Sequence, residues 1–456
     1  AARMLDIGYS DVSVLEGGIA AWEASGHPIY SGVHVPSKAF AEVVEHEAGT
    51  PYITAQELRA LIDDKADIAI YDTRSYEEYH SNSIPGAVSV PGAEIVYRFK
   101  DLTPSPDTTV VVNCGGRTRS IIGAQALINA GVPNKVVSLK NGTQDWHLAG
   151  YEVVKGATRQ APDVSDTGFE AALAGARRVA KLCDIQIIDR STLEQWRAEA
   201  EIRTLYVLDV RTPEEYAASH VAGVKHIAGG QLVQETDAHL ATWGARVVLL
   251  DDNGIRATMT ASWLKQMGWD VAIMTNEEAG GDIASGPHKP AIQGFDSSKA
   301  VRISPQDLNE RISTGSVNVV DLNWSRGYYE GHIPGAWYAI RARLDADLGQ
   351  LPSAEALVFT SPDGTLAAVA AADRSAADGS VMALEGGTDA WVAAGLPLET
   401  GASNMASAAE DIRLRAREQD GEIEAAMRAY LAWEIELVND MAKDDDHRFN
   451  VIAPPT

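Results

Sequence analysis

The sequence predicts an α/β fold made of tandem modules, each a small parallel sheet covered by helices on both faces. Three observations predict it: apolar strands alternate with helical segments, the same segment types recur in the same order, and their spacing is nearly constant. Continuous apolar strands that alternate with helices are typical of parallel sheets buried on both sides. A helical C-terminal tail follows the last module.

Each module begins with a strand that ends at an aspartate, followed by a charged helical turn and a glycine-containing turn. The matching segments are 69–92, 206–230 and 319–340. In the first of them Asp72 is followed two residues later by Arg74. We predict that this pair supports the site as a structural strand-end ion pair and does not itself reach substrate.

The second recurring element is an apolar strand, a polar loop with glycine, and an amphipathic helix, at 109–132, 246–269 and 356–379. The strand-end aspartate precedes the first loop residue by 42 positions in two modules and by 40 in the third. These first loop residues are Cys114, Asp251 and Ser361. A repeated scaffold therefore carries three different side chains at one position.

The third element is a short strand, a glycine turn and a helix carrying tryptophan, at 12–32, 136–156 and 381–401. We interpret Trp22, Trp146 and Trp391 as core anchors. Because Ala1 aligns just beyond the loop of a module, we expect the earlier strands and the loop of that module to precede this sequence, together with the true N-terminus. That missing part is where a second active site or a signal peptide would lie.

These recurrences divide the chain into seven parts. We predict the C-terminal part of a truncated module at 1–32, a linker at 33–50, complete modules at 51–156, 183–292 and 299–401, a helical linker at 157–182 and a helical tail at 402–456. The tail has apolar residues at helical spacing, which pack either on a neighbouring module or on a partner helix. They are Ile423, Met427, Tyr430, Leu431, Leu437, Val438 and Met441.

Composition excludes several classes of function. The net charge of −26 and a pI near 4.8 argue against nucleic acid or an anionic membrane as partner, because phosphate binding needs a basic surface. Two cysteines in 456 residues form no disulfide framework, which favours a reducing, cytoplasmic location. No apolar run approaches the ~18 residues of a membrane span.

The motifs resemble those of the rhodanese (thiosulfate sulfurtransferase-like) family. They are "YDTR" at 71–74, "EEY" at 77–79, "SIPGA" at 83–87, "CGGRTRS" at 114–120, "NGTQDW" at 141–146 and "GHIPGA" at 331–336. The resemblance implies a catalytic Cys114 at the head of a six-residue substrate-binding loop that continues through Gly115, Gly116, Arg117, Thr118 and Arg119. Where this sequence has Arg117 the family often has glycine, which leaves the donor open.

A loop of this kind suits sulfur transfer, which needs a thiolate. We expect backbone N–H groups, the helix N-terminus and the two arginines to lower the pKa of Cys114 and to hold an anionic donor such as thiosulfate. Cys114 would form a persulfide and pass its sulfur to cyanide or a thiol, without cofactor or metal. Cys183, among apolar residues, is predicted to be a core residue.

Two alternatives remain open. Related folds use a cysteine and an arginine for phosphatase or arsenate reductase chemistry, but their loops resemble C-x5-R, whereas Cys114 to Arg119 is C-x4-R. The other alternative is a sulfur carrier or scaffold, because Asp251 and Ser361 cannot carry a persulfide. We interpret those two modules as architectural or regulatory. They or the tail helix would serve self-association or bind a protein acceptor.

Overall fold

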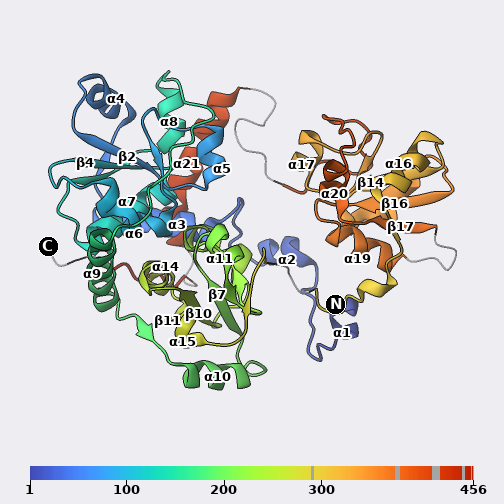
Figure 1. Ribbon diagram of the computed structural model, residues 1–456, viewed down its shortest axis with the longest axis horizontal. Helices are drawn as coiled ribbons and strands as arrows, with labels where there is room; N and C mark the ends of the chain where they lie inside the picture. Colours follow the sequence, from blue (N-terminus) through green and yellow to red (C-terminus); the bar gives the residue numbers. More distant parts are fainter. Residues whose placement is uncertain (289–291, 375–379, 413–421, 444–446, 453, 455–456) are drawn as a thin grey trace. The chain divides into compact units, whose positions relative to one another are not determined.

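A computed structural model describes residues 1–288, 292–374, 380–412, 422–443, 447–452 and 454 (Figure 1). The chain forms two compact units. One contains Ala1–Leu15 with Ala291–Arg415, and the other contains Glu16–Pro290 with Ala416–Thr456.

The first complete module lies in the larger unit and has a five-stranded sheet in the order β1-β5-β4-β2-β3, with every pairing parallel. Its strands are β1 (Tyr52–Ile53), β2 (Ile68–Asp72), β3 (Val88–Ser89), β4 (Thr109–Asn113) and β5 (Val136–Leu139). Its helices are α4 (Ala55–Asp63), α5 (Tyr76–Ser81), η1 (Gly92–Glu94), α6 (Ile95–Leu102), α7 (Thr118–Ala130) and α8 (Gly142–Leu148).

Alternation along β4 explains why helices cover both faces of this sheet. Val110 and Val112 belong to one buried cluster, whereas Val111 between them belongs to another. Successive side chains of a strand point to opposite faces, so an all-apolar strand must be covered twice. Accordingly, α6 and α7 lie on one side of β2 and β4, and α4 and α8 lie on the other (Figure 1).

The second complete module repeats this sheet in the same unit, with the order β6-β11-β10-β7-β9. Its strands are β6 (Gln186–Ile187), β7 (Leu205–Asp209), β8 (His220–Val221), β9 (Lys225–His226), β10 (Arg246–Asp251), β11 (Asp270–Thr275) and β12 (Ile283–Ala284), of which β8 and β12 form a separate antiparallel pair. Its helices are α10 (Arg190–Ala198), α11 (Pro213–Ala218), α12 (Gly229–Gln234), α13 (Thr236–His239), α14 (Ile255–Gln266) and α15 (Asn276–Ala279).

The two modules share one core. Val110 and Val112 of β4 belong to the same buried cluster as Val247 and Leu249 of β10, and Trp263 of α14 lies among them. Helices from both linkers, α3 (Val35–Ala48) and α9 (Asp166–Leu182), pack against this cluster. The shared core joins the two modules into one body, since apolar burial is the dominant favourable term in folding.

The third module lies in the other unit and has the sheet order β13-β17-β16-β14-β15. Its strands are β13 (Arg302–Ile303), β14 (Val317–Asp321), β15 (Trp337–Tyr338), β16 (Ala356–Thr360) and β17 (Val381–Leu384). Its helices are η2 (Ser297–Lys299), α16 (Pro305–Ser313), α17 (Ser325–Glu330), η3 (Arg341–Arg343), α18 (Leu344–Asp347), η4 (Leu348–Gln350), α19 (Thr365–Asp373) and α20 (Gly387–Ala393).

The N-terminal segment contains α1 (Ala2–Asp6) and α2 (Gly18–Ala24). Trp22 donates its ring N–H to the carbonyl six residues later, as Trp146 and Trp391 do. Trp146 and Trp391 are buried core anchors, as predicted, but Trp22 is 40% exposed, so its prediction was wrong. The physical reason is that residues 1–34, whose backbone is fully described, contain no strand to form a sheet over it.

The tail contains α21 (Ile423–Met441), and residues 413–421, 444–446, 453 and 455–456 of the predicted tail lie outside the described residues. The tail's apolar stripe buries Met427, Leu431, Leu437 and Met441, and α21 packs against α3 of its own unit. Intramolecular packing, one of the two predicted uses of this face, therefore occurs.

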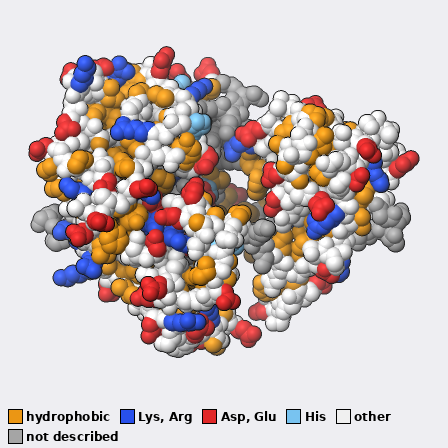
Figure 2. All heavy atoms as spheres, in the orientation of Figure 1, with side chains coloured by type: hydrophobic (Ala, Val, Ile, Leu, Met, Phe, Trp, Pro, Cys, Tyr) orange, Lys and Arg blue, Asp and Glu red, His pale blue; other side chains and the backbone are white. Residues whose placement is uncertain are grey.

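The surface of the face shown in Figure 2 carries acidic and basic side chains interspersed with one another. Basic side chains are scattered over it and do not gather into one patch. Among the described residues, no helix combines the length and apolarity needed to cross a membrane.

Candidate active site

The cysteine lies in a turn between a strand end and a helix start. Cys114 directly follows β4, and α7 begins four residues later at Thr118. Because Asp72 and Asn113 are paired in the register of β2 and β4, the two strand ends meet at the same edge of the sheet. Cys114 is only 2% exposed. The sequence predicted this strand–loop–helix geometry.

The loop is held from its other side by the start of α8. Thr143 donates its backbone N–H to the Cys114 carbonyl at 2.9 Å, and Gln144 donates to Gly115 at 3.3 Å. Gly142 has a φ of +54°, and a Cβ there would overlap the Cys114 carbonyl oxygen. The close approach therefore requires glycine, which explains why "NGT" follows β5.

The Cys114 sulfur contacts the first turn of α7. The Cys114 thiol donates to the Ser120 hydroxyl oxygen at 3.5 Å, and the Ser120 backbone N–H donates to the sulfur. The Ser120 hydroxyl donates in turn to the Arg117 carbonyl at 2.8 Å. Sequence reasoning missed Ser120, although one signal was available: the corresponding residues of the other modules are Ala257 and Ala367.

Burial raises the pKa of the Cys114 thiol, which is opposite to the expected direction. Desolvation is the largest cause, and it outweighs the charge of Arg119 and the hydrogen bonds with Ser120, which lower the pKa. Glu434 raises the pKa further. The expectation was wrong because it counted the donors of the loop and not the exclusion of water around it.

Arg117 is engaged by the linker helix α3. Its Nε donates to Glu42 Oε1 at 2.5 Å and its Nη2 donates to Glu42 Oε2 at 2.7 Å, while Glu45 also pairs with Nη2. The Arg117 side chain is 5% exposed. Burial raises the pKa of Glu42 to about 7 although Arg117 lowers it. The Arg117 guanidinium therefore joins α3 to the loop, a role that the sequence did not reveal.

Arg119 is the loop arginine whose charge acts on Cys114. Its guanidinium makes a two-bond contact with Glu78 of α5, at 2.6 and 2.9 Å, and remains 17% exposed. The predicted strand-end pair also exists: Arg74 Nη2 lies 2.6 Å from Asp72 Oδ2, and both side chains are buried. The Arg74 side chain also lies beside Gly115.

Glu434 of α21 contacts the loop, although it lies 316 residues after Thr118 in the sequence. Thr118 donates its hydroxyl to Glu434 Oε1 at 2.9 Å. Glu434 is only 1% exposed. Its Oε2 is buried without a hydrogen-bond partner among the described residues. Sequence reasoning missed it, yet one signal was present: this glutamate falls within the apolar stripe between Leu431 and Leu437.

The second module keeps the loop but fills it with a carboxylate. Asp251 accepts backbone N–H bonds from Asn253, Gly254 and Ala257 at 3.2, 2.5 and 3.1 Å. In the third module Ser361 Oγ accepts from the Ala367 backbone N–H at 3.2 Å. In all three loops, the amide six residues after the first position therefore binds the first side chain.

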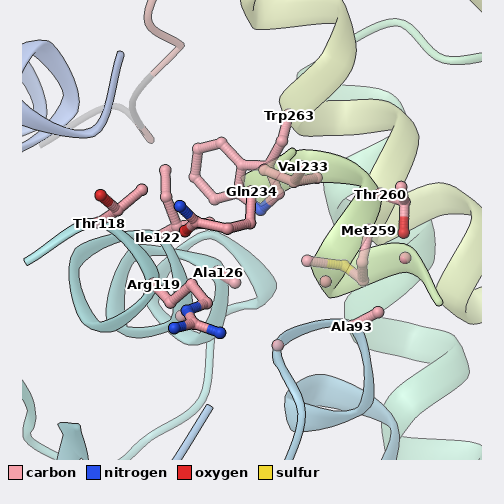
Figure 3. Close-up of a pocket in the computed structure, with 14 residues that line it drawn as sticks. Ala93, Thr118, Arg119, Ile122, Ala126, Val233, Gln234, Met259, Thr260 and Trp263 are labelled. Atoms are coloured by element: carbon pink, nitrogen blue, oxygen red, sulfur yellow. The ribbon is translucent and has the colours of Figure 1, made fainter. Parts of the chain in front are cut away.

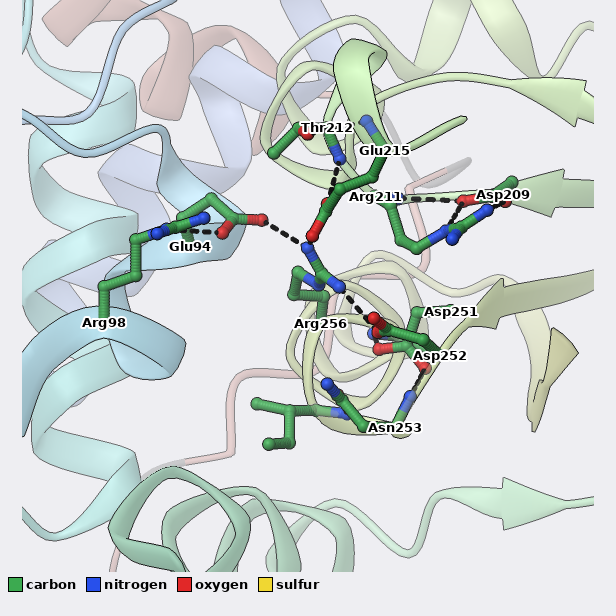
Figure 4. A network of polar contacts seen from close by, with 12 residues as sticks. Glu94, Arg98, Asp209, Arg211, Thr212, Glu215, Asp251, Asp252, Asn253 and Arg256 are labelled. Carbon is green, nitrogen blue, oxygen red and sulfur yellow. Dashed lines mark hydrogen bonds and ion pairs between the residues drawn. The ribbon is translucent and has the colours of Figure 1, made fainter. Parts of the chain in front are cut away.

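Arg256, at the position of Arg119, is locked in a buried network between the modules (Figure 4). Its Nη1 lies 2.5 Å from Glu215 and 3.3 Å from Glu94 of the first module, and its Nη2 lies 2.6 Å from Asp252. The Arg256 side chain has no exposed surface. This loop is therefore built into the contact between the two modules.

A cavity lies between α7 and α14, and Thr118 and Arg119 are among the residues that line it (Figure 3). Its other wall includes Val233, Met259 and Trp263 of the second module, and its volume is about 30 Å³. That volume accommodates about one water molecule. A second cavity of about 420 Å³ lies at the far ends of α6 and α7, beside α9. Neither cavity places a donor at Cys114.

Comparisons with known proteins agree with the fold of the three modules. A family model described as "Rhodanese-like domain" matches residues 54–149, 189–276 and 304–394. A crystal structure of thiosulfate sulfurtransferase from Pseudomonas aeruginosa is 45% identical with a TM-score of 0.91, over 99% of this chain and 86% of that chain. An HTH-type transcriptional regulator of Mycobacterium tuberculosis is 33% identical over 91 residues, and YrkF of Bacillus subtilis is 28% identical over 102 residues. These matches cover 20% and 22% of this chain, and the chain spans 39% and 54% of the length of these curated relatives.

Proposed function

Because the chain belongs to the rhodanese-like domain family, we propose that it is a sulfurtransferase that carries sulfur as a persulfide on Cys114. The observation that carries the proposal is the Cys114 loop itself. It alone among the three equivalent loops combines a thiol, a neighbouring serine and an arginine whose charge acts on the sulfur. The 45% identity to a thiosulfate sulfurtransferase over nearly the whole chain supports the same conclusion.

In the first step the Cys114 thiolate attacks the outer sulfur of the donor. With thiosulfate, an S–S bond forms at Cys114, the donor's S–S bond breaks, and sulfite leaves with the electron pair. Ser120 and Arg119 lie where they stabilise the sulfur anion before and after this step. Gly115 and Gly116 add no side chain of their own next to the sulfur.

In the second step a thiol or cyanide attacks the terminal sulfur of the persulfide. The new bond forms to the acceptor, and the Cys114 thiolate is restored with the electron pair of the broken S–S bond. This gives ping-pong kinetics with a covalent intermediate. We assign Arg117 to holding α3 against the loop, and Asp72 with Arg74 to supporting it, because these side chains are engaged with protein partners.

The other modules take architectural roles in this proposal. Arg256 ties the second loop to Glu94 of the first module, which supports architecture over chemistry there. Contact with a protein acceptor through these modules, and self-association, belong to the same proposal. Both cysteines are free and buried, which fits a reducing compartment such as the cytoplasm.

The test is anaerobic mass spectrometry after exposure to thiosulfate, mercaptopyruvate and a thiol persulfide. We expect an adduct of one sulfur atom on the Cys114 peptide, lost in Cys114→Ser, and thiocyanate formation from thiosulfate and cyanide. An adduct without turnover would assign a sulfur carrier instead. Hydrolysis of an aryl phosphate with no sulfur adduct would overturn the proposal in favour of phosphatase chemistry.

A further inference from the structure

The tail helix α21 places a buried carboxylate on the catalytic loop. Glu434 accepts a hydrogen bond from the Thr118 hydroxyl, and a Cβ added to Gly116 would lie 3.1 Å from Glu434 Oε2. The face of the loop at Gly116, where the loop itself carries no side chain, is thus covered by Glu434 together with Gln144 and Tyr430. Its Oε2 has no hydrogen-bond partner among the described residues.

The charges around this carboxylate do not favour a second anion. Three cations, Lys38, Arg117 and Arg119, act on Glu434. Arg117 is paired with Glu42 and Glu45, and Arg119 is paired with Glu78. Both loop arginines therefore already have carboxylate partners before any donor arrives. In a water-poor site, an added charge is felt more strongly than in bulk water.

Lys38 is the cation that balances Glu434 from α3. It is 5% exposed, donates to the Val33 carbonyl at 2.7 Å, and lies over the rings of Tyr430 and Trp433 at 5.1 and 4.9 Å from their centroids. Burial raises the pKa of Glu434, and the charge of Lys38 is the largest of the effects that lower it. Glu434 and Lys38 therefore act on the loop with opposite signs, which provides two independent ways to change its potential.

We propose that Glu434 is a specificity-determining residue that disfavours anionic sulfur donors, because its carboxylate occupies the place at Thr118 and Gly116 where a sulfonate would bind. The preferred donor then carries its sulfane sulfur on an uncharged group, as an alkyl hydropersulfide does in its neutral, protonated form. With that donor, Cys114 forms the new S–S bond, the donor's S–S bond breaks, and the thiolate of the donor leaves with the electron pair. This inference rests on the proposed function.

The test compares alkylation of Cys114 by iodoacetate and iodoacetamide, reagents of similar size that differ by one negative charge. Second-order rate constants are measured at pH 8.5 on the Cys114 peptide of the full chain. The ratio of the two rates cancels the thiolate fraction and the steric cover by α21. We expect Glu434→Gln to raise the iodoacetate-to-iodoacetamide ratio by about 10-fold, as removal of one nearby charge predicts.

Glu436→Gln is the matched control, since it removes the same charge from an exposed position of the same helix. It should leave the ratio within about twofold, because charges in water are strongly screened. An unchanged iodoacetate-to-iodoacetamide ratio in Glu434→Gln would overturn the proposal. If both rates rose equally, α21 would cover the thiol only sterically.

Lys38→Gln guards against a Glu434 variant that fails to fold. It should lower the same ratio, and an unchanged or raised ratio would contradict the proposal. The readout is also separable from the proposed function, because alkylation needs only a thiolate. A charge-dependent ratio in a protein that never gains a sulfur adduct would sink sulfur transfer, whereas normal sulfur loading with an unchanged ratio would sink the role of Glu434.

Discussion

The Cys114 loop and the Asp251 loop hold their first side chain in the same way, yet their arginines differ. Ser120 donates its backbone N–H to the Cys114 sulfur, and Ala257 donates to the Asp251 carboxylate. Arg119 has one carboxylate partner and acts on the sulfur, whereas Arg256 is fully buried among three carboxylates.

The difference separates the scaffold from the chemistry. Since Asp251 accepts three backbone N–H bonds, the loop is an anion-binding turn even where no nucleophile is present. What the first module adds is a thiol, a serine beside it and an arginine with one carboxylate partner. The comparison therefore predicts that the fold tolerates substitution of the first loop residue. It also predicts that placing a cysteine in the second loop does not by itself make that loop transfer sulfur.

The largest expected effect comes from moving the cysteine between the loops. Cys114→Ser should reduce persulfide formation and thiocyanate production on the order of 1,000-fold or more, because a serine hydroxyl is not ionised at neutral pH. Adding Asp251→Cys to this variant should not restore either, since position 251 is fully buried and Arg256 is neutralised. Mass spectrometry of both peptides gives the answer, and a sulfur adduct on residue 251 would break the comparison.

The next effect concerns stability. Arg256→Met leaves Glu94, Glu215 and Asp252 without their shared cation, and breaking a buried ion pair costs about 3–5 kcal/mol of unfolding free energy. Arg119→Met removes one pair whose side chains are 17% and 24% exposed, so it should cost less, about 1.5–3 kcal/mol. Urea denaturation of both variants measures this difference. Equal losses of unfolding free energy would mean that the two arginines contribute equally to stability.

A smaller effect is expected where α8 approaches the loop. Gly142→Ala combines a left-handed backbone with overlap on the Cys114 carbonyl, and should cost about 2–4 kcal/mol. Gly150→Ala is the matched control, because Gly150 also has a positive φ but nothing lies within 4 Å of the added Cβ. It should cost about 1 kcal/mol. Thermal unfolding distinguishes them, and similar melting temperatures would show that α8 can move away from the loop.

The sequence predicted the repeated sheets, the position of Cys114 after a strand and the core roles of Trp146 and Cys183, because these features depend on local patterns. Burial in the shared core raises the pKa of Cys183 to about 11, as befits an inert residue. Trp22 was misjudged because a local motif does not reveal whether a sheet is present to cover it.

The partners of the loop could not be predicted, since they come from distant parts of the chain. Glu42 of α3 and Glu434 of α21 meet the loop only through tertiary packing. Helical spacing marks Glu434 as polar within an apolar stripe, but it does not say which surface that stripe covers. The direction of the Cys114 pKa shift was missed for the same reason, because desolvation depends on all of the covering elements.

The smallest expected effect lies in the serine beside the sulfur. Ser120→Ala makes this loop like the other two, which have Ala257 and Ala367 there. The thiolate is the reactive form, and burial already raises the pKa of Cys114, so its reaction rate should keep increasing with pH above the ordinary cysteine range. Because Ser120 lowers that pKa, its loss should move the midpoint to still higher pH and slow iodoacetamide alkylation severalfold at neutral pH.

Ser138→Ala is the control for this last comparison, since Ser138 is buried in the same sheet and its hydroxyl donates to the Pro51 carbonyl. Its pH profile for Cys114 should match that of the unaltered protein. A midpoint that stays in place in Ser120→Ala would show that the hydroxyl remains on the Arg117 carbonyl when the thiolate forms. In that case the backbone amide shared by all three loops would suffice for the sulfur anion, and the arginine would be the feature that sets the catalytic loop apart.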